Sequence, residues 1–198
     1  MDQRRSKIVR ETAETQITVE INLDGQGHYS LDTGNGMLDH LLSQLSRHGL
    51  IDLNIKANGD TDVGWHHLVE DLGIVLGQAL VKAVGDAKGI TRMAHSYVPL
   101  DEALALTVVD YGGRGYSVID APMSDSDLGG LPADLIRHFL ESFSREGRFN
   151  LHVKLISGIN NHHKAEAIFK SLARSLRSAL SHDPKQANQI PSTKGTIV

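Results

Sequence analysis

Six of the eleven histidines in this 198-residue chain fall into two matching sets, and each set also contains a glutamate. Two adjacent pairs, His66-His67 and His162-His163, are each followed by a glutamate in the pattern His-His-x-x-Glu. A further histidine precedes each pair, His40 by 26 residues (66 − 40) and His138 by 24 residues (162 − 138). Imidazole nitrogens and carboxylate oxygens bind divalent transition metals, so this recurrence predicts metal binding. The candidate ligands are His40, His66, His67, Glu70, His138, His162, His163 and Glu166.

Helix geometry decides how adjacent histidines can be shared between ions. On a helix His66 and Glu70 lie on one stripe, whereas His67 points about 100° away, so one ion cannot readily bind both histidines. Two equivalent sites follow, because the second motif behaves in the same way. Each site combines a His–Glu pair from one half of the chain, the offset histidine of the other half, and one of His40 and His138. Three nitrogens and one carboxylate oxygen suit Mn²⁺ or Fe²⁺, and Zn²⁺ also binds imidazole well.

Composition excludes several other classes of function. The chain has 20 Lys and Arg against 24 Asp and Glu, a net charge of −4, so it lacks the basic excess of a nucleic-acid binder. It has no cysteine, which excludes disulfides, thiolate nucleophiles and cysteine-based metal sites. The basic N-terminus lacks the apolar run of a signal peptide, and no stretch approaches the ~18 apolar residues of a membrane span. We therefore expect a soluble, cytoplasmic protein with neither nucleic-acid nor membrane partners.

The spacing of apolar residues predicts the elements that carry the motifs. Residues 16–23 are rich in β-branched side chains and precede a glycine-containing turn and a second extended run, which predicts a hairpin. Leucines at helical spacing predict a helix over residues 37–48 that ends at Gly49. Strict alternation predicts a half-buried strand over residues 51–57, and a 3.6-residue period predicts a long helix over residues 65–84.

The second half of the chain repeats the first. An offset of 88 pairs Glu14 with Glu102, and an offset of 96 pairs His66 with His162. An offset of 98 pairs His40 with His138, Gly49 with Gly147, and Lys56 with Lys154. This period is too long for a solenoid and suits two half-domains related by a pseudo-twofold axis. The sequence predicts an α+β fold of duplicated strand–strand–helix–strand–helix half-domains, with sheets packed on a helical layer. Residues 1–198 form one domain with repeats at about 1–90 and 91–182, and the tail 183–198 has no counterpart.

The chain also resembles the imidazoleglycerol-phosphate dehydratase family, in its monofunctional form, over nearly its whole length. The matching segments are RETAET (10–15), LDGQG (23–27), LDHLLSQLSRHGLIDL (38–53), HHLVED (66–71), PLDEAL (99–104), GRGY (113–116), RHFLESF (137–143), GINNHHKAEAIFKSLARSLRSA (158–179) and PSTKG (191–195). The resemblance implies a fold like the second domain of ribosomal protein S5. It also implies a carbon–oxygen lyase (hydro-lyase) activity in histidine biosynthesis, the dehydration of D-erythro-imidazole-glycerol phosphate to imidazole-acetol phosphate.

The resemblance implies a cofactor and an assembly as well. The family uses two Mn²⁺ ions per subunit, which bind the substrate's imidazole and favour its imidazolate form. Carried onto this chain, one ion is bound by His40, His67, His162 and Glu166, and the other by His66, Glu70, His138 and His163. These sets agree with the pairing deduced from helix geometry. The family's sites lie between subunits of a homo-oligomer, and the resemblance implies 24 subunits.

Residues that hold the substrate follow from the same resemblance. Arg92, Arg114 and Lys194 match phosphate-anchoring positions together with Ser192 and Thr193, and both arginine and lysine suit phosphate. The tail 183–198 is thus implied to bind substrate.

The catalytic carboxylates implied are Glu14 and the ligands Glu70 and Glu166. Glu14 falls in the substrate pocket, where its carboxylate could take the proton from the chain carbon. It could instead hydrogen-bond a substrate hydroxyl, and its repeat partner Glu102 could be structural.

One segment departs from the family pattern, which commonly has two aspartates before the first His-His pair and a threonine after it. Here Gly64, Trp65 and Leu68 stand at these positions. The ligands are intact, so the departure concerns the groups that orient His66 and His67. Asp71, whose repeat equivalent is Ala167, is interpreted as a supporting or structural residue rather than a ligand.

Two other functions could use the same ligands. A binuclear metal hydrolase has a similar inventory of His and Glu, but the sequence has neither a P-loop nor a carboxylate-rich bridging motif. Alternatively, the metals could be purely structural and join subunits of an inactive shell.

Overall fold

The computed structural model describes residues 4–124 and 127–197, which form two four-stranded sheets and four long helices. The first half contains β1 (Arg5–Glu11), β2 (Thr15–Asn22), β3 (Tyr29–Asp32), α1 (Gly36–Gly49), β4 (Asp52–Gly59) and α2 (His66–Val84). The second half contains β5 (Met93–Leu100), β6 (Ala103–Asp110), β7 (Tyr116–Asp120), α3 (Asp134–Glu146), β8 (Asn150–Ser157) and α4 (Asn161–Ala179). Two short 3₁₀ helices are η1 (Thr61–Val63) and η2 (Pro184–Gln186). The predicted duplicated α+β fold is confirmed.

The strand order corrects the predicted hairpin. The sheets run β1-β2-β4-β3 and β5-β6-β8-β7, so β2 lies between β1 and β4, and β3 pairs in parallel with β4. Helix α1 connects β3 to β4, and a strand–helix–strand crossover brings its two strands together in parallel. The hairpin is made instead by β1 and β2. Strand β1 has no fully buried residue, which explains why its apolar pattern is too weak to predict it.

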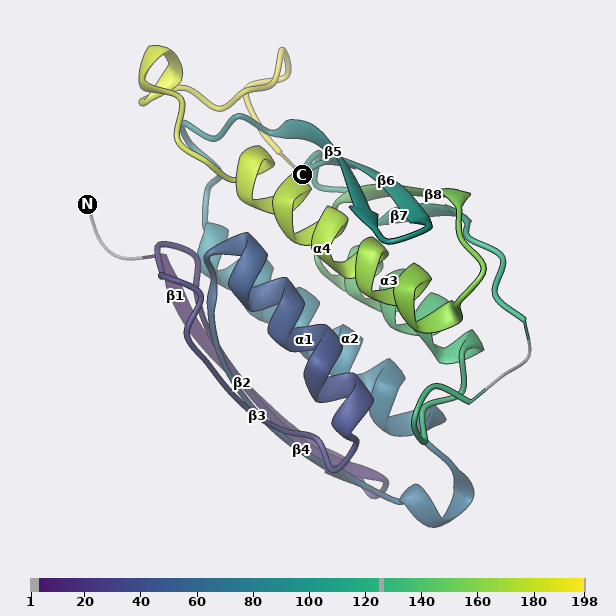
Figure 1. The fold of residues 1–198 in the computed structure, drawn as a ribbon. Coiled ribbons are helices and arrows are strands. Elements are labelled where there is room, and N and C mark those ends of the chain that lie inside the picture. Colours follow the sequence, from purple (N-terminus) through teal and green to yellow (C-terminus); the bar gives the residue numbers. More distant parts are fainter. Residues whose placement is uncertain (1–3, 125–126, 198) are drawn as a thin grey trace.

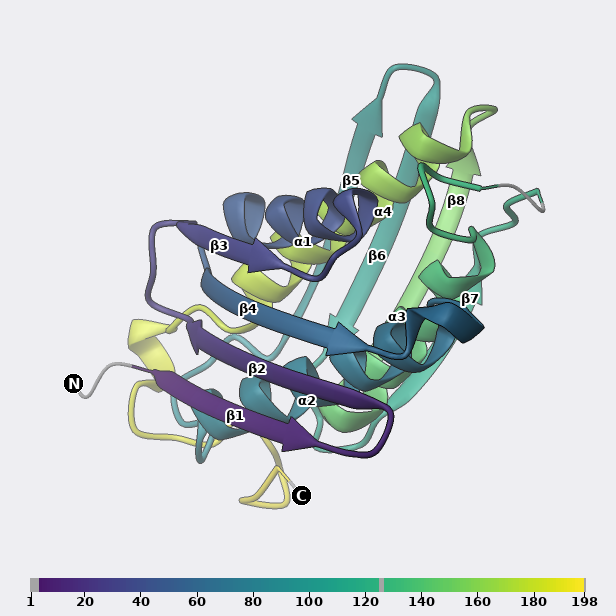
Figure 2. The same cartoon turned by 90° about the horizontal axis from the view of Figure 1, so that it is seen from below.

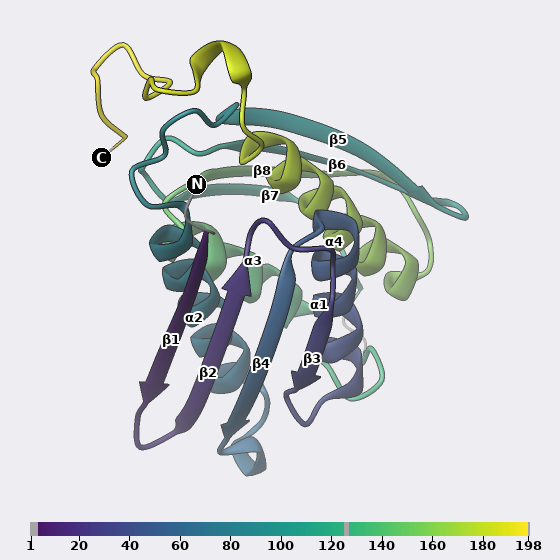
Figure 3. The same cartoon turned by 90° about the vertical axis from the view of Figure 1, so that its left-hand side faces the viewer.

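The two halves meet through their helices. Each sheet lies on the outside and carries the helices of its own half on one face (Figure 1). Helix α1 packs on α4 and α2 packs on α3, so the principal helix contacts join one half to the other. Figures 2 and 3 show the strands of the second sheet running across those of the first. In the described part of the chain, no helix combines the length and the apolar character that crossing a membrane requires.

A close backbone approach joins α2 to α3. Gly77 of α2 faces Gly147, where a Cβ atom at position 77 would lie 2.6 Å from the Gly147 nitrogen. At the equivalent place on the other helix pair, a Cβ at Gly49 of α1 would lie 3.6 Å from the backbone oxygen of Ala173. The α2–α3 contact is therefore the tighter of the two, and it requires glycine.

The outer faces of the two sheets differ in polarity. Positions related by the repeat carry polar residues on the first sheet and apolar residues on the second: Arg5 and Met93, Glu20 and Val108, Ser30 and Val118. Val108 and Val118 are 39% and 42% exposed and line a groove of about 530 Å³ with Leu106 and His152. At these positions the outer face of the second sheet is therefore more apolar than that of the first.

We expect Gly77→Ala to destabilise the protein by about 1–3 kcal/mol, because the added methyl group overlaps the backbone of Gly147. Gly36→Ala is the matched control, since a Cβ there meets no atom within 4 Å. Urea unfolding at one fixed protein concentration measures both. Equal midpoints for Gly77→Ala and the parent protein would show that the helix layer can separate without cost.

Candidate metal clusters and phosphate pocket

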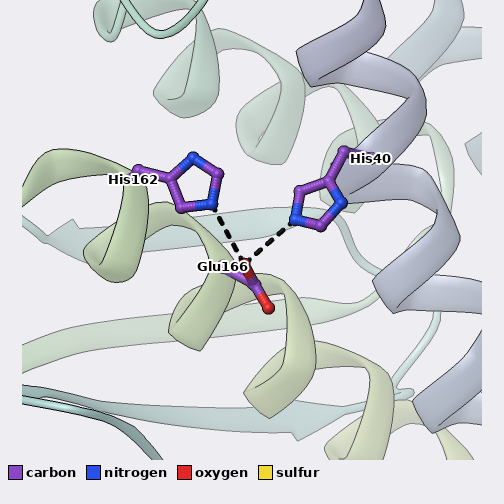
Figure 4. Close-up of side chains that lie close together, drawn as sticks. All are labelled: His40, His162 and Glu166. Carbon is purple, nitrogen blue, oxygen red and sulfur yellow. Dashed lines mark hydrogen bonds and ion pairs between the residues drawn. The ribbon is translucent and has the colours of Figure 1, made fainter.

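The first candidate metal cluster joins the two halves. His40 comes from α1, and His162 and Glu166 come from the first turns of α4 (Figure 4). The Nε2 atoms of His40 and His162 lie 3.0 and 3.2 Å from the same oxygen of Glu166, and the ligand atoms of all three residues lie within 4.8 Å of one another. A cavity of about 770 Å³ adjoins the cluster and is lined by both histidines. The α1–α4 contact decides that His40, rather than His138, accompanies this His–Glu pair.

Glu166 is held in its ionised form. Its side chain is 12% exposed, and its second oxygen lies 2.5 Å from the Lys170 ammonium. Burial opposes ionisation, but hydrogen bonds from Lys170 and His40 outweigh it and lower the pKa of Glu166 to about 2. One oxygen thus faces lysine and the other faces the histidines. Sequence reasoning missed Lys170, although its place four residues after Glu166 on a helix was the available signal.

The second candidate cluster is the pseudo-symmetric counterpart of the first. His66 and Glu70 come from α2 and His138 comes from α3. The His66 Nε2 lies 3.7 Å from Glu70, and the rings of His66 and His138 are 4.6 Å apart between centroids. Arg145 lies 3.7 Å from the other oxygen of Glu70. This cluster is looser than the first but draws the same residue types from the equivalent helices.

The offset histidines are not in these clusters. The Nδ1 of His67 lies 3.2 Å from Asp60 and 3.9 Å from Glu14. The Nδ1 of His163 lies 2.7 Å from Glu102. The structure therefore brings the ligand atoms of three residues of the first predicted set within 4.8 Å of one another. It places three residues of the second set side by side less closely, and the fourth residue of each set lies elsewhere.

Carboxylates orient both offset histidines. Hydrogen bonding to Asp60 raises the pKa of His67, with a further contribution from Glu14, and hydrogen bonding to Glu102 raises the pKa of His163. A carboxylate at Nδ1 favours the proton on that atom and leaves Nε2 as the ligand nitrogen. Sequence reasoning did not predict Asp60 as a partner, because the loop that carries it has no repeat signal.

The two motif helices begin differently. Asn160 caps α4, where its side chain accepts hydrogen bonds from the backbone nitrogens of His162 and His163. Glu102 accepts hydrogen bonds from His163 and from the backbone nitrogens of Asn160 and Ile159, which lower its pKa to about 2. Helix α2 has Trp65 at its N-cap, with no side-chain capping bond among the described residues, and Gly64 before it at φ 108°.

Both clusters fit a divalent transition metal by the chemistry of their donors. Each offers two imidazole nitrogens and one carboxylate oxygen, a donor set that suits Mn²⁺, Fe²⁺ or Zn²⁺. Three protein donors leave positions for a fourth protein ligand and for substrate. The group Glu14, Asp60 and His67 also lies within 4.8 Å, but its two carboxylates are partly or fully exposed.

The predicted phosphate-anchoring residues line one pocket. Its volume is about 150 Å³, and its walls include Arg92, Arg114, Ser192, Thr193 and Lys194. The guanidinium of Arg92 donates to Asp110 at 2.7 Å and to the backbone oxygen of Pro191 at 2.8 Å. It thereby ties the tail to the second sheet. Asp110 was not predicted, since nothing in the local sequence relates it to Arg92.

The candidate phosphate pocket and the candidate metal clusters lie at opposite ends of the folded subunit. The tail follows the end of α4, whereas the cluster residues of α2 and α4 lie where these helices begin (Figures 1 and 3). Helix α4 alone has 19 residues and is about 28 Å long. One chain therefore cannot bring its own pocket and its own clusters to one small substrate.

Comparison with known proteins places this geometry in a family. The sequence model described as imidazoleglycerol-phosphate dehydratase matches residues 33–176. An imidazoleglycerol-phosphate dehydratase of Dehalococcoides mccartyi is 52% identical over 197 residues, which cover 100% of this chain and 99% of that protein. The enzyme of the same name from Albidiferax ferrireducens is 51% identical and covers 98% of this chain, which spans 95% of it.

Solved structures agree with these relatives. The crystal structure of imidazoleglycerol-phosphate dehydratase from Staphylococcus aureus has a TM-score of 0.82 and 36% identity, covering 90% of this chain and 99% of that one. The enzyme from Pyrococcus furiosus, in complex with (S)-C348, also has a TM-score of 0.82, with 34% identity and coverage of 96% and 99%.

We expect Arg114→Ala and Lys194→Ala each to weaken the binding of inorganic phosphate by about tenfold or more, because each removes a charge-assisted hydrogen bond. Metal content should not change, since the clusters lie at the other end of the chain. Calorimetric titration with phosphate and metal analysis measure the two effects. Arg177→Ala, at an exposed cation near the end of α4, is the control and should bind phosphate like the parent. Loss of metal in Lys194→Ala would contradict the assignment.

Proposed function

The chain belongs to the imidazoleglycerol-phosphate dehydratase family, the carbon–oxygen lyases of histidine biosynthesis, and from this premise we propose a mechanism that uses two metal ions. The substrate is D-erythro-imidazole-glycerol phosphate and the product is imidazole-acetol phosphate. The observation that carries the proposal is the pair of pseudo-symmetric clusters, each with two imidazoles and one carboxylate at the contact between the halves.

Each ion has four proposed protein ligands. The first cluster takes His67 as its fourth ligand, and the second takes His163. Mn²⁺ is the proposed metal, because mixed nitrogen and oxygen ligands with open positions suit it. When bound, the ions would supply Lewis acidity to the imidazole ring of the substrate and favour its imidazolate form, whose charge helps to expel the hydroxyl from the ring-bonded carbon. The ligand carboxylates Glu70 and Glu166 contribute to catalysis by holding these ions.

The remaining chemistry falls to residues of this chain. Glu14 takes the proton from the middle carbon of the chain, the hydroxyl on the ring-bonded carbon departs, and this proton and hydroxyl are released together as water. The carbon–carbon double bond formed is an enol, which becomes the ketone of the product by moving one proton from oxygen to carbon. Arg92, Arg114 and Lys194, with Ser192 and Thr193, hold the phosphate. These contacts orient the three-carbon chain relative to Glu14.

Self-association completes the site in this proposal. The offset histidines lie outside the three-residue clusters, and the phosphate pocket lies at the far end of the same chain. A second copy can supply the missing ligand, and the apolar outer face of the second sheet offers a contact surface. We propose a homo-oligomer, with the 24 subunits that the family resemblance implies, located in the cytoplasm.

Metal removal tests the proposed function directly. The purified protein should release water from imidazoleglycerol phosphate, which the appearance of the ketone product measures. Chelation should abolish the activity, and Mn²⁺ should restore it, because the ions supply the Lewis acidity. If metal analysis finds less than one ion per ten chains and the protein is still fully active, the two-metal mechanism is excluded. Phosphate release in place of ketone formation would indicate a hydrolase.

Subunit mixing tests where the fourth ligand comes from. His40→Ala and His67→Ala should each be inactive alone. In this proposal each site takes its three-residue cluster from one subunit and His67 from another. In an equal mixture of the two variants about a quarter of the sites contain every ligand, so activity should return towards a quarter of the parent's. His40→Ala mixed with His162→Ala is the control and should stay inactive, because both residues belong to one three-residue cluster of one chain. No recovery in the first mixture would mean that His67 acts within its own chain.

A further inference from the structure

An ionic cluster occurs in the first half of the fold at a place where the second half is apolar. The offsets of 88 and 96 pair Arg10 with Val98, Thr15 with Ala103, and Asp71 with Ala167. The three residues of the second half are buried, with exposed fractions of 8%, 1% and 0%. The same backbone therefore accepts either an ionic or an apolar solution at this place.

The ionic cluster is closely connected. The Nη2 of Arg10 lies 3.1 Å from one oxygen of Asp71, and the Thr15 hydroxyl donates to the other oxygen at 2.6 Å. The Asp71 side chain is 13% exposed. The Nε of Arg10 is buried and has no acceptor among the described residues. The Arg10 side chain is 38% exposed, and a partly exposed ion pair contributes little to stability, so stability alone does not explain these three residues.

The cluster holds the β1–β2 turn, which carries Glu14. Thr15 follows Glu14 directly, and its hydroxyl is the one bound to Asp71. Inside the turn, the Thr12 hydroxyl accepts hydrogen bonds from the backbone nitrogens of Glu14 and Thr15 at 3.2 and 2.9 Å. The backbone oxygen of Glu14 accepts from the Asp60 nitrogen at 3.0 Å. The backbone on both sides of Glu14 is thus fixed, while its side chain is 56% exposed and lies 3.9 Å from His67.

The equivalent turn of the second half has a different task. Glu102 is bound to His163 at 2.7 Å and to the backbone nitrogens of Ile159 and Asn160 at 3.1 and 2.8 Å. Its carboxylate is therefore committed to the start of α4. Of the two glutamates related by the repeat, Glu14 is the one whose carboxylate is directed to solvent.

We propose that Arg10, Thr15 and Asp71 form a positioning triad that fixes the β1–β2 turn and aims the Glu14 carboxylate beside His67. Because only the first half has this triad, the first half transfers the proton although the two halves are otherwise similar. This inference rests on the role of Glu14 in the proposed function. Neither Arg10 nor Asp71 touches the substrate in it; both act through Glu14.

The test converts the triad to the apolar version that the second half already uses. The triple variant Arg10→Val/Thr15→Ala/Asp71→Ala should keep the unfolding midpoint, the metal content and KM of the parent. Its kcat should fall by about 10²-fold, because a displacement of about 1 Å in a reacting group has this effect. A folded, metal-loaded triple variant with the parent's kcat would overturn the proposal. If the triple variant does not fold, Asp71→Asn, which keeps the side-chain shape, is measured in the same way, and an unchanged kcat is again decisive against the triad.

A Glu14→Gln background separates positioning from general damage. The triple variant should lower kcat in the parent but should lower it no further when Glu14 is already Gln, since the triad acts through that carboxylate. An equal loss in both backgrounds would overturn the proposal. Glu14→Gln with the parent's kcat would instead refute the role of Glu14 in the proposed function.

Arg4→Met is the matched control. Arg4 directly precedes β1, at the end of the strand remote from the β1–β2 turn. The substitution breaks the ion pair of Arg4 with Asp24, in which the Arg4 Nη2 lies 2.6 Å from the Asp24 Oδ1. We expect a lower unfolding midpoint and an unchanged kcat. A kcat loss as large as that of the triple variant would show that any disturbance near β1 slows the reaction, and would remove the case for the triad.

Discussion

Helix packing between the two halves is the constraint on which both metal clusters depend. His40 and the pair His66 and Glu70 belong to the same half, yet they lie in different clusters because α1 packs on α4 and α2 packs on α3. Neither half can build a cluster alone. The His-His pairs also lie in the first turns of α2 and α4, so the helix starts carry the ligand side chains. Fold and ligand chemistry therefore act at the same place.

The halves are alike at the proposed metal clusters and unlike at the residues proposed to contact substrate. The two clusters use the same residue types on equivalent helices. By contrast, Glu102 is bound to the start of α4, whereas the side chain of Glu14 is exposed. The tail that lines the phosphate pocket has no counterpart in the first half. A substrate has one phosphate and loses one proton. Two identical halves would offer each function twice and would not fix one orientation of the substrate.

Sequence patterns predicted the helices well because a helix depends on local periodicity, and the eight metal ligands remain a prediction. The helices expected at 37–48 and 65–84 are found at Gly36–Gly49 and His66–Val84. The strand β1 and the true partner of β2 were missed, since an edge strand has a weak apolar pattern and strand order depends on contacts remote in sequence. For the same reason spacing alone left open whether His40 or His138 accompanies His162, although the family resemblance implied His40. The partner Asp60 is set by a tertiary distance that no local pattern encodes, whereas the spacing of Lys170 four residues after Glu166 was a local signal.

The crosswise sharing of helices has an evolutionary consequence. In the pseudo-twofold contact, each half supplies one histidine that lies beside the His–Glu pair of the other half. Such a contact is the intramolecular form of an isologous interface. A homodimer of a single ancestral half would already have contained both clusters, made by one gene and related by true symmetry. Fusion of two copies would have kept the metal chemistry and freed each half to diverge. The hydroxyl and charged side chains around Asp71, which are apolar at the equivalent places of the second half, and the tail without a counterpart are differences of this kind.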